Sequence, residues 1–320
     1  MRFKQIVLYI LKRLLIAIPV LIGITLIDYA IMNLAGNPLK MLMGPRVSQT
    51  AIEAKAIEMG LNKPFLVRYG IWLMQVLGGN LGFSIKTYEP VATMISSRLG
   101  PTLLLMGTSL LISLLIAIPA GIYSAVKQYS IGDYLIVGFS FLSISVPSFF
   151  LALVMIYFFT STLGWLPSSG MYTLGAKRTL QDTVMHMIMP VTVMSASLIG
   201  NNIRYIRSGM LEILQQNYLR TARAKGIGEF RVINKHALRN ALITIVTVIG
   251  MQIPMVFGGA VIIEQVFSWP GLGLMTMSAI LARDYPVIMG VALLSAVVVL
   301  LSNLLTDIVY ALIDPTISLE

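Results

Sequence analysis

The densest group of ionisable side chains in this chain lies in residues 217–244, NYLRTARAKGIGEFRVINKHALRNALIT. This segment holds six of the 23 basic residues and a single acid, Glu229, and it sits between long apolar stretches. Two functions would explain this concentration of basic residues. It is either a basic docking surface for a soluble partner or a positively charged loop that only sets membrane topology, and charge alone favours neither.

The order of residues inside this segment predicts a helix–turn–helix. A helix-prone run is followed by the break Gly226-Ile227-Gly228, and a second amphipathic run comes after it. Glycine suits such a break because it adopts backbone conformations that other residues avoid. We therefore expect two short helices joined by a turn and held at the membrane surface.

Residues for catalysis or metal binding are scarce. The two histidines, His186 and His236, are predicted on opposite sides of the membrane, which excludes a histidine metal cage built by this chain alone. The chain has no cysteine and no GxxxxGK(S/T), GxSxG or HExxH motif. We expect no catalytic residue, no metal, no cofactor and no ATP hydrolysis by this chain itself.

Three carboxylates lie within or near the apolar stretches: Asp28, Glu264 and Asp307. Ionisable residues at such places are functional candidates by default, and interfacial hydrogen bonding is the structural alternative for each. None falls clearly at mid-membrane, where a proton-coupled carrier would more typically place one. Because the spans are largely apolar, we expect that any transport by this chain is powered by another protein.

The composition is that of an integral membrane protein. Of 320 residues, 57% are hydrophobic and 11% are charged, whereas soluble domains carry about 25% charged residues. The mean hydropathy is +0.85. The net charge of +10 fits basic loops that face anionic headgroups better than it fits a nucleic-acid partner.

Six apolar segments are long enough to cross a bilayer as helices, which takes about 20 residues each. They predict an all-α integral membrane protein with six transmembrane helices, at approximately 14–35, 102–126, 134–160, 187–205, 241–263 and 287–313. Prolines inside or at the edges of spans usually mark kinks. These prolines are Pro19, Pro119, Pro147, Pro190 and Pro254.

Charge predicts the orientation. Arg2, Lys4, Lys12 and Arg13 precede the first span, which places the N-terminus in the cytoplasm by the positive-inside rule. With six spans the C-terminus is cytoplasmic too, and the loop 204–240 with its eight basic residues falls inside. The expected location is the cytoplasmic (inner) membrane, crossed several times.

The segment between the first two spans predicts a small extracytoplasmic lobe. Residues 48–60 form a helix in this interpretation, 64–77 have helical apolar spacing, and 78–82 form a turn. The chain then divides into a first helix with this lobe, a transmembrane domain with a cytoplasmic loop, and a cytoplasmic tail. Their ranges are 1–95, 96–313 and 314–320.

The loop between the fifth and sixth spans, SWPGLGLMTMSAILARDYP, predicts a turn followed by a short helix. Folded back between two spans, this helix would form an outer gate. As an interfacial connector it would have no such role, and the two interpretations stand equal. The candidate gate residues are Glu264, Pro270, Gly271, Gly273 and Asp284.

Together these segments resemble the inner-membrane permease subunits of binding-protein-dependent ATP-driven importers, in the peptide/nickel family. That family's general loop pattern is Glu-Ala-Ala, three residues, Gly, nine residues and Ile-x-Leu-Pro, and Ala222, Gly226 and Leu238 match it. YLRTARAKG followed by HALRNAL looks like the version typical of the peptide/nickel branch. Other similar stretches are SVPSFFLALVMIYFF with LGWLPSSG, EQVFSWPGLG, RDYPVIMG and NLLTDIVYALIDP, so the resemblance covers nearly the whole chain.

Some positions depart from the family pattern. Arg220, Thr221, His236 and Arg239 differ from the general loop pattern but suit the peptide/nickel branch. Outside the loop, the departures bear on the external lobe and the tail rather than on ATPase docking. They are Asn37 and Asn80, where the family often has aspartate, and Thr316, where it often has arginine.

The resemblance implies a type I ABC importer transmembrane domain and its partners. These are a second, homologous permease in a heterodimer, two cytoplasmic ATPase subunits that use ATP and Mg, and an extracytoplasmic substrate-binding protein. Ala222 and Ala224 would allow close approach to an ATPase, and Arg223 and Lys225 would meet its acidic or carbonyl groups. The implied coupling residues are Thr221, Ala222, Arg223, Ala224, Lys225, Gly226, Ile227, Gly228, His236, Leu238 and Arg239.

Several functions remain open at this point. The first is import of di- or oligopeptides, and the second is import of nickel or another small solute by the same architecture. An ATP-independent secondary carrier or channel and a membrane scaffold without transport belong to other classes. Co-purification with an ATPase would separate the importers from these.

Overall fold

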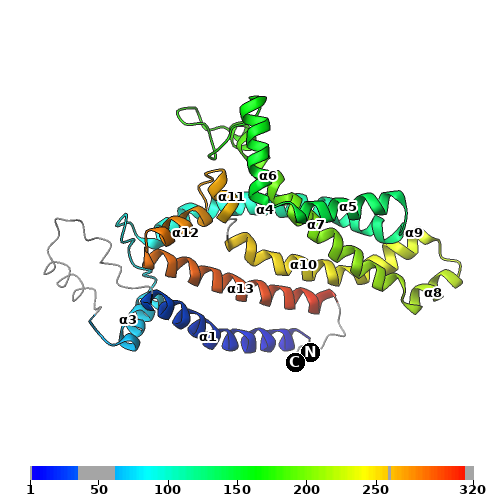
Figure 1. Ribbon diagram of the computed structural model, residues 1–320. Coiled ribbons are helices and arrows are strands. Elements are labelled where there is room, and N and C mark those ends of the chain that lie inside the picture. The colour runs from blue at the N-terminus through cyan, green and yellow to red at the C-terminus, as the bar shows by residue number, and fades with distance from the viewer. Residues whose placement is uncertain (1, 35–61, 259–260, 314–320) are drawn as a thin grey trace.

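The computed structural model describes residues 2–34, 62–258 and 261–313, and within them the regular structure is helical apart from an isolated β-bridge between Phe83 and Pro90. Figure 1 shows α1, α4, α7, α10 and α13 running lengthwise, with α6 projecting from them. The elements in chain order are α1 Arg2–Leu34, α3 Phe65–Leu77, α4 Val91–Val126, α5 Ile131–Ser145, α6 Ser148–Met155, the π-helix η2 Ile156–Thr162, α7 Leu180–Leu214, α8 Asn217–Ala224, α9 Glu229–Arg231, the π-helix η3 Val232–Ala237, α10 Leu238–Gly258, α11 Val261–Val266, α12 Leu272–Leu281 and α13 Tyr285–Ile313.

Within the described residues, four helices are long and apolar enough to cross a membrane, namely α1, α4, α7 and α13. They correspond to the first, second, fourth and sixth expected spans. A fifth crossing is added if the bent pair α5 and α6–η2 is one span. The apolar part of α10, Ile245–Pro254, is shorter than a full crossing, so the count of six spans stays a prediction.

The expected third span is not one straight helix. It breaks between α5 and α6 with a bend of 94°, much sharper than a kink. Val146 there adopts an extended backbone, φ −82° and ψ 120°, because the ring of Pro147 disfavours the helical conformation in the residue before it. By contrast, helices α1, α4, α7 and α10 continue through their prolines.

The lobe after the first helix is partly described. The expected helix at 64–77 is confirmed as α3, which packs on α1 through Tyr29 and Tyr69, whose ring centroids lie 5.7 Å apart. Thr25 and the buried Tyr69 also share a hydrogen bond of 2.9 Å. The turn at 78–82 is confirmed by positive φ at Gly79 and Gly82. The expected helix at 48–60 lies outside the described residues.

Small residues let the central helices approach closely, as is common between membrane helices. A Cβ atom on Gly121 of α4 would lie 2.9 Å from Ile206 of α7. One on Gly200 of α7 would lie 2.7 Å from the carbonyl oxygen of Ser140 in α5. Larger residues at either glycine would therefore push these helices apart.

A polar cluster lies inside this apolar packing. The amide of Asn202 in α7 donates to Ser113 Oγ of α4 at 2.9 Å, and Gln252 of α10 donates to Asn202. All three side chains are buried. The cluster therefore joins three helices by hydrogen bonds that are buried inside the packing.

A second polar contact joins the first and last helices. Asp307 of α13 pairs with Arg13 of α1 at 2.8 Å and accepts a hydrogen bond from Tyr9 at 3.0 Å. For Asp307, this agrees with the structural interpretation of a carboxylate near a span end.

Candidate functional site

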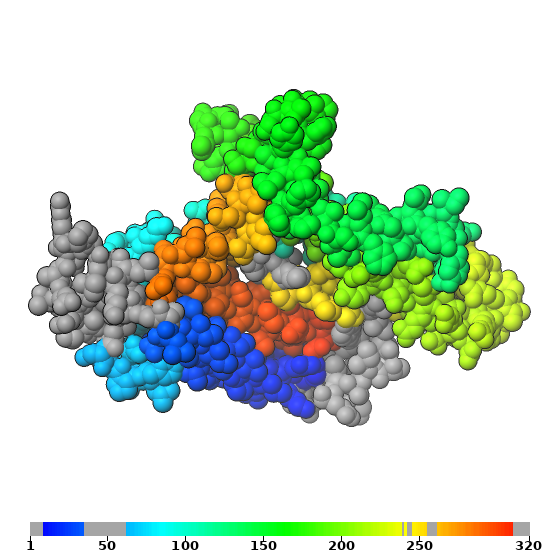
Figure 2. Space-filling model, viewed as in Figure 1, coloured from blue at the N-terminus to red at the C-terminus, as the bar shows by residue number. Residues whose placement is uncertain are grey.

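The basic segment folds as expected into short helices joined by a turn, at the end of the molecule opposite α3 and α12 (Figure 1 and Figure 2). The helices are α8, α9 and η3. The side chains of Leu219, Val232 and Ala237 are fully buried, and they form one apolar core with residues of α4, α7 and α10. The segment is therefore packed on the long helices rather than hanging from them as a loose loop.

Gly226 forms the turn. Its φ is +77°, a conformation that costs other L-residues about 1–2 kcal/mol. The amide of Gly226 donates to the carbonyl of Arg223 at 2.9 Å, and that of Ile227 donates to the carbonyl of Ala222 at 3.3 Å, which is the Schellman pattern of a helix end. Gly228 has a φ of −60°, so its backbone does not require glycine.

An ion pair closes the turn. Arg223 donates to Glu229 at 2.7 and 3.0 Å. The hydrogen bond from Arg223, together with its positive charge, lowers the pKa of Glu229 below its usual value. Each side chain stays partly open to solvent, so the pair contributes little to stability. The ion pair does connect α8 to α9 across the turn.

The outer surface of the segment is basic with one large apolar side chain. Phe230 is 82% exposed, and a large exposed aromatic side chain is a candidate interface anchor. We define the coupling surface as the exposed residues of the segment around it. They are Arg220, Thr221, Arg223, Ala224, Lys225, Gly226, Gly228, Glu229, Phe230 and Arg231.

Not every residue expected at this surface lies on it. Ala222 is buried in the segment's own core, so it packs within the chain instead of allowing a partner to approach. Arg223 is already paired with Glu229. Ile227, His236 and Leu238 are partly buried. The side chain of Arg239 lies outside the described residues, and Phe230 was not among the expected residues.

A buried ion pair near this segment was not expected from the sequence. Asp133, at the start of α5, accepts two hydrogen bonds from Arg207 of α7 at 3.0 Å each. Ser124 of α4 donates to the same carboxylate, and the amide of Tyr129 donates to it at 2.9 Å. The Ser130-x-x-Asp133 spacing marks a helix start, but nothing local indicates the partner 74 residues away.

The candidate gate residues lie at both ends of α12. At its N-terminus, Glu264 is fully buried. Its carboxylate accepts from Thr102 Oγ1 of α4 at 2.9 Å and from the amide of Leu274 at 2.9 Å. Thr102 Oγ1 accepts in turn from the amide of Leu272 at 2.7 Å. A carboxylate at a helix N-terminus is favourable because free amides and the helix dipole face it.

Two glycines make room for this carboxylate. A Cβ on Gly271 would lie 2.4 Å from both Glu264 Oε1 and Thr102 Oγ1. A Cβ on Gly273 would lie 3.0 Å from Glu264 Oε2 and 2.8 Å from the Cα of Val261. Glu264, Gly271 and Gly273 therefore form one constellation with Thr102.

Pro270 and Asp284 make different contacts. The carbonyl of Pro270 accepts from Arg98 of α4 at 3.4 Å. At the other end of α12, Asp284 accepts from Ser84 Oγ at 2.5 Å and from the amide of Ile85 at 3.0 Å. Both ends of α12 are therefore tied to α4 or to the segment that leads into it. Within the described residues, no group of three or more His, Cys, Asp or Glu could hold a metal ion.

With this geometry established, comparison with known proteins decides the family. Residues 117–319 match the family model described as the binding-protein-dependent transport system inner membrane component. The chain belongs to this family. It is a permease subunit.

Individual relatives of the permease match over nearly its full length. The oligopeptide transport system permease protein AppB of Bacillus subtilis is 43% identical over 97% of this chain and 98% of its own. The dipeptide transport system permease protein DppB of Alkalihalophilus pseudofirmus is 38% identical over the same shares.

A solved structure supports the fold of the permease. The MetNI methionine ABC transporter, in an inward-facing form, matches with a TM-score of 0.54 over 70% of this chain and 97% of the other. At 17% identity this likeness shows the fold alone. The permease thus has the all-helical fold of an ABC importer transmembrane subunit.

Proposed function

We propose that this permease carries di- or oligopeptides across the cytoplasmic membrane as one transmembrane subunit of an ATP-driven importer. The single observation that carries the choice of substrate is the name of its relatives, since AppB and DppB are an oligopeptide and a dipeptide permease. The coupling surface supports the ATP-driven part of the proposal.

The partners follow from this function. A second, homologous permease completes the pathway, two cytoplasmic ATPase subunits bind ATP and Mg, and an extracytoplasmic binding protein delivers the substrate. The basic coupling surface, which includes the exposed Phe230, would dock on an ATPase. A basic surface with an aromatic anchor suits a groove that is acidic at its rim.

The orientation is part of the proposal. The coupling surface and the N-terminal end of α1, with Lys12 and Arg13, would face the cytoplasm because loops rich in lysine and arginine are retained inside. The end with α3 and α12 would then face the outside, where the binding protein arrives.

The mechanism is mechanical. Because α8 and η3 pack into one core with α4, α7 and α10, a force on the coupling surface reaches the long helices without a flexible joint. Closure of the ATPases on ATP would push the segment, and the long helices would rock between inward-open and outward-open states.

Uptake in a strain that lacks this gene and in its complemented parent tests the substrate. Loss of labelled dipeptide uptake alone is the expected result. Loss of nickel uptake alone would mean that the importer architecture is right but that the substrate is nickel. If neither uptake is lost, the proposal is wrong for both solutes.

Gly226→Arg tests the coupling surface. We expect it to abolish transport while leaving the amount of permease in the membrane unchanged. Gly164→Arg is the matched control, since Gly164 also has a positive φ, 66°, and open space around its Cβ, but lies far along the chain from the coupling surface. Normal uptake by Gly226→Arg would reject the docking role.

A further inference from the structure

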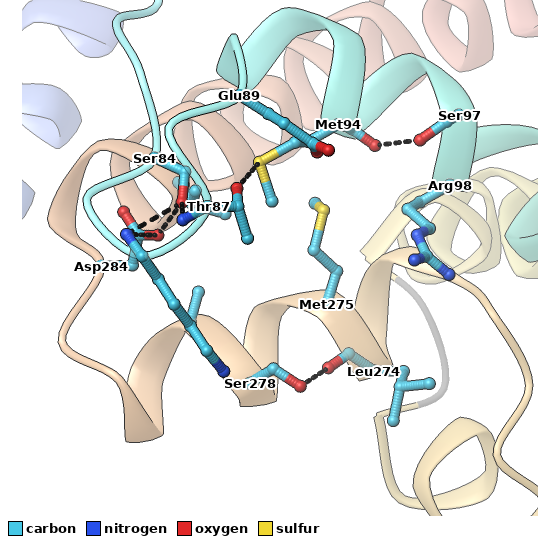
Figure 3. Close-up of a pocket in the computed structure, with 13 residues that line it drawn as sticks. Ser84, Thr87, Glu89, Met94, Ser97, Arg98, Leu274, Met275, Ser278 and Asp284 are labelled. Atoms are coloured by element: carbon cyan, nitrogen blue, oxygen red, sulfur yellow. Dashed lines mark hydrogen bonds between the residues drawn. The ribbon is translucent and has the colours of Figure 1, made fainter.

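A pocket of about 230 Å³ lies at the end of the molecule opposite the coupling surface, between the loop before α4, the first turns of α4, α12 and the start of α13 (Figure 3). It is separate from the Glu264 constellation at the N-terminus of α12. Its lining combines four charged side chains, Lys86, Glu89, Arg98 and Asp284, with apolar and hydroxyl groups. The residues used below are Lys86, Glu89, Met94, Arg98, Met275 and Ser278.

The loop that forms one wall is fixed by hydrogen bonds. The buried Asp284 accepts from Ser84 Oγ and from the amides of Ile85 and Lys86. Ser84 Oγ in turn accepts from the amide of Thr87 at 2.9 Å. The backbone that carries Lys86 and Glu89 is therefore preorganised, and a ligand would not have to order it.

The pocket presents both signs of charge. Within the described part of the chain, neither Lys86 nor Glu89 has a side-chain hydrogen bond or ion pair, and Arg98 makes one long contact to the carbonyl of Pro270, 3.4 Å. Figure 3 shows Glu89 and Arg98 at separate places on the rim, with the thioethers of Met94 and Met275 pointing toward the space between. The pocket therefore has charged side chains at its edge and the methionine thioethers inside.

This combination selects a class of ligand. An anion alone would be repelled by Glu89, and a cation alone would be repelled by Lys86 and Arg98. A metal ion would find Glu89 and thioethers, because the other carboxylate, Asp284, already accepts hydrogen bonds from Ser84 and two backbone amides, and this leaves too few hard or borderline donors. A zwitterion satisfies both signs at once, and its apolar part would contact the methionines, which adapt to different shapes.

The size narrows the class further. A volume of about 230 Å³ is room for roughly eight waters at their liquid volume, and it is below the usual range of drug-sized pockets. A pocket of this volume can hold a dipeptide with small side chains, or a compact short peptide whose two charged termini lie close together. On the orientation proposed above, the pocket opens on the side where substrate arrives.

We propose that this pocket is a receiving site for zwitterionic short peptides, with Glu89 binding the α-ammonium group and Arg98 binding the α-carboxylate. The proposal rests on the proposed function, peptide import, and gives the permease itself a part in recognising both peptide ends. Ser278 is placed to hydrogen-bond the peptide unit.

The test compares free and blocked dipeptides in proteoliposomes that contain the whole importer, with the binding protein at a saturating concentration. The substrates are Ala-Ala, N-acetyl-Ala-Ala and Ala-Ala-amide, each radiolabelled. The variants are Glu89→Gln and Arg98→Gln. Because the binding protein is the same throughout, a change in the ratio of free to blocked uptake between wild type and variant reports on the permease.

We expect Glu89→Gln to lower uptake of Ala-Ala about tenfold, the loss typical of one charge-assisted hydrogen bond, and to leave N-acetyl-Ala-Ala unchanged. Arg98→Gln should likewise lower uptake of Ala-Ala about tenfold and leave uptake of Ala-Ala-amide unchanged. Glu89→Asp should recover part of the loss. Glu212→Gln, the same change on an exposed residue of α7, is the matched control and should change no ratio.

Two results would overturn the inference. One is unchanged uptake of both free and blocked substrates in both variants, and the other is an equal loss for free and blocked substrates, which is a structural effect. The proposed function fails separately, if wild-type proteoliposomes accumulate no dipeptide at all.

Discussion

Asp133 and Arg207 join three helices with one carboxylate, because the two hydrogen bonds between them, 3.0 Å each, are completed by Ser124 at the end of α4. Asp133 is buried and Arg207 is partly exposed. The pair lies next to the core that holds the coupling surface. It fixes the ends of α4 and α7 relative to the start of α5.

Asp133→Asn should therefore destabilise the permease, because it leaves the Arg207 charge partly buried without its partner. Breaking a buried pair costs about 3–5 kcal/mol, and the exposure of Arg207 puts this one at or below the lower end. Thermal unfolding of the purified complex in detergent would measure it. Arg204→Gln, a change to an exposed arginine on the same helix, should shift the midpoint little. A second change, Arg207→Gln, in the Asp133→Asn background should recover part of the loss.

Gly271→Ala should displace the carboxylate that caps α12. The new Cβ would come within 2.4 Å of Glu264 Oε1 and Thr102 Oγ1, both fully buried, and overpacking of this kind costs about 1–3 kcal/mol. Gly138→Ala in α5 has nothing within 4 Å of its Cβ and serves as the control. Equal thermal stability of the two variants would show that the Glu264 constellation tolerates extra volume.

Gln252→Leu should leave the buried amide of Asn202 without its α10 partner. Hydrogen bonds between membrane helices contribute about 0.6–2 kcal/mol each, so the unfolding midpoint should fall measurably. Gln265→Leu, which changes an exposed glutamine of α11, is the control. If the two variants unfold alike, the amide pair does not stabilise the packing of α7 on α10.

The Arg223–Glu229 pair predicts a pH dependence of the coupling surface. Since the pKa of Glu229 is lowered in the folded segment, the stabilisation is present above the ordinary glutamate pKa of 4.5 and is lost as the pH falls through the lowered value. The pair is exposed, so its contribution is about 0.5 kcal/mol or less. Hydrogen exchange of residues 217–237, corrected for intrinsic rates, should be faster in Glu229→Gln than in the wild type at pH 7. The difference should shrink below pH 4.5. A difference that persists there would assign the effect to something other than the charge.

Local features were the ones that the sequence predicted well. The turn at Gly226 and the helix 64–77 depend on neighbouring residues, and both are confirmed. Glu264 could be recognised as unusual because a carboxylate beside an apolar span is rare. Its partner Thr102 lies 162 residues away, and no local pattern connects the two.

The missed features depend on tertiary packing. Pro147 predicted a kink in the third span, but the local sequence does not determine the size of the bend, which is 94°. The packing of neighbouring helices decides the direction that the chain takes after such a break. Ala222 was assigned to a partner because it is small, and it lies instead in the segment's own core. A small side chain permits close approach without indicating which surface approaches.

The length of α4 has a consequence for how far small motions carry. Its 36 residues make a rod of about 54 Å, with the receiving pocket at its first turns and the core of the coupling surface at its last. A tilt of about 5° around one end would displace the other by roughly 5 Å, about one helical turn. Because both ends of α12 are bonded to α4 or to the segment before it, α12 would swing with it. A small movement at the coupling surface would thus become a displacement of about 5 Å at the far end of α4.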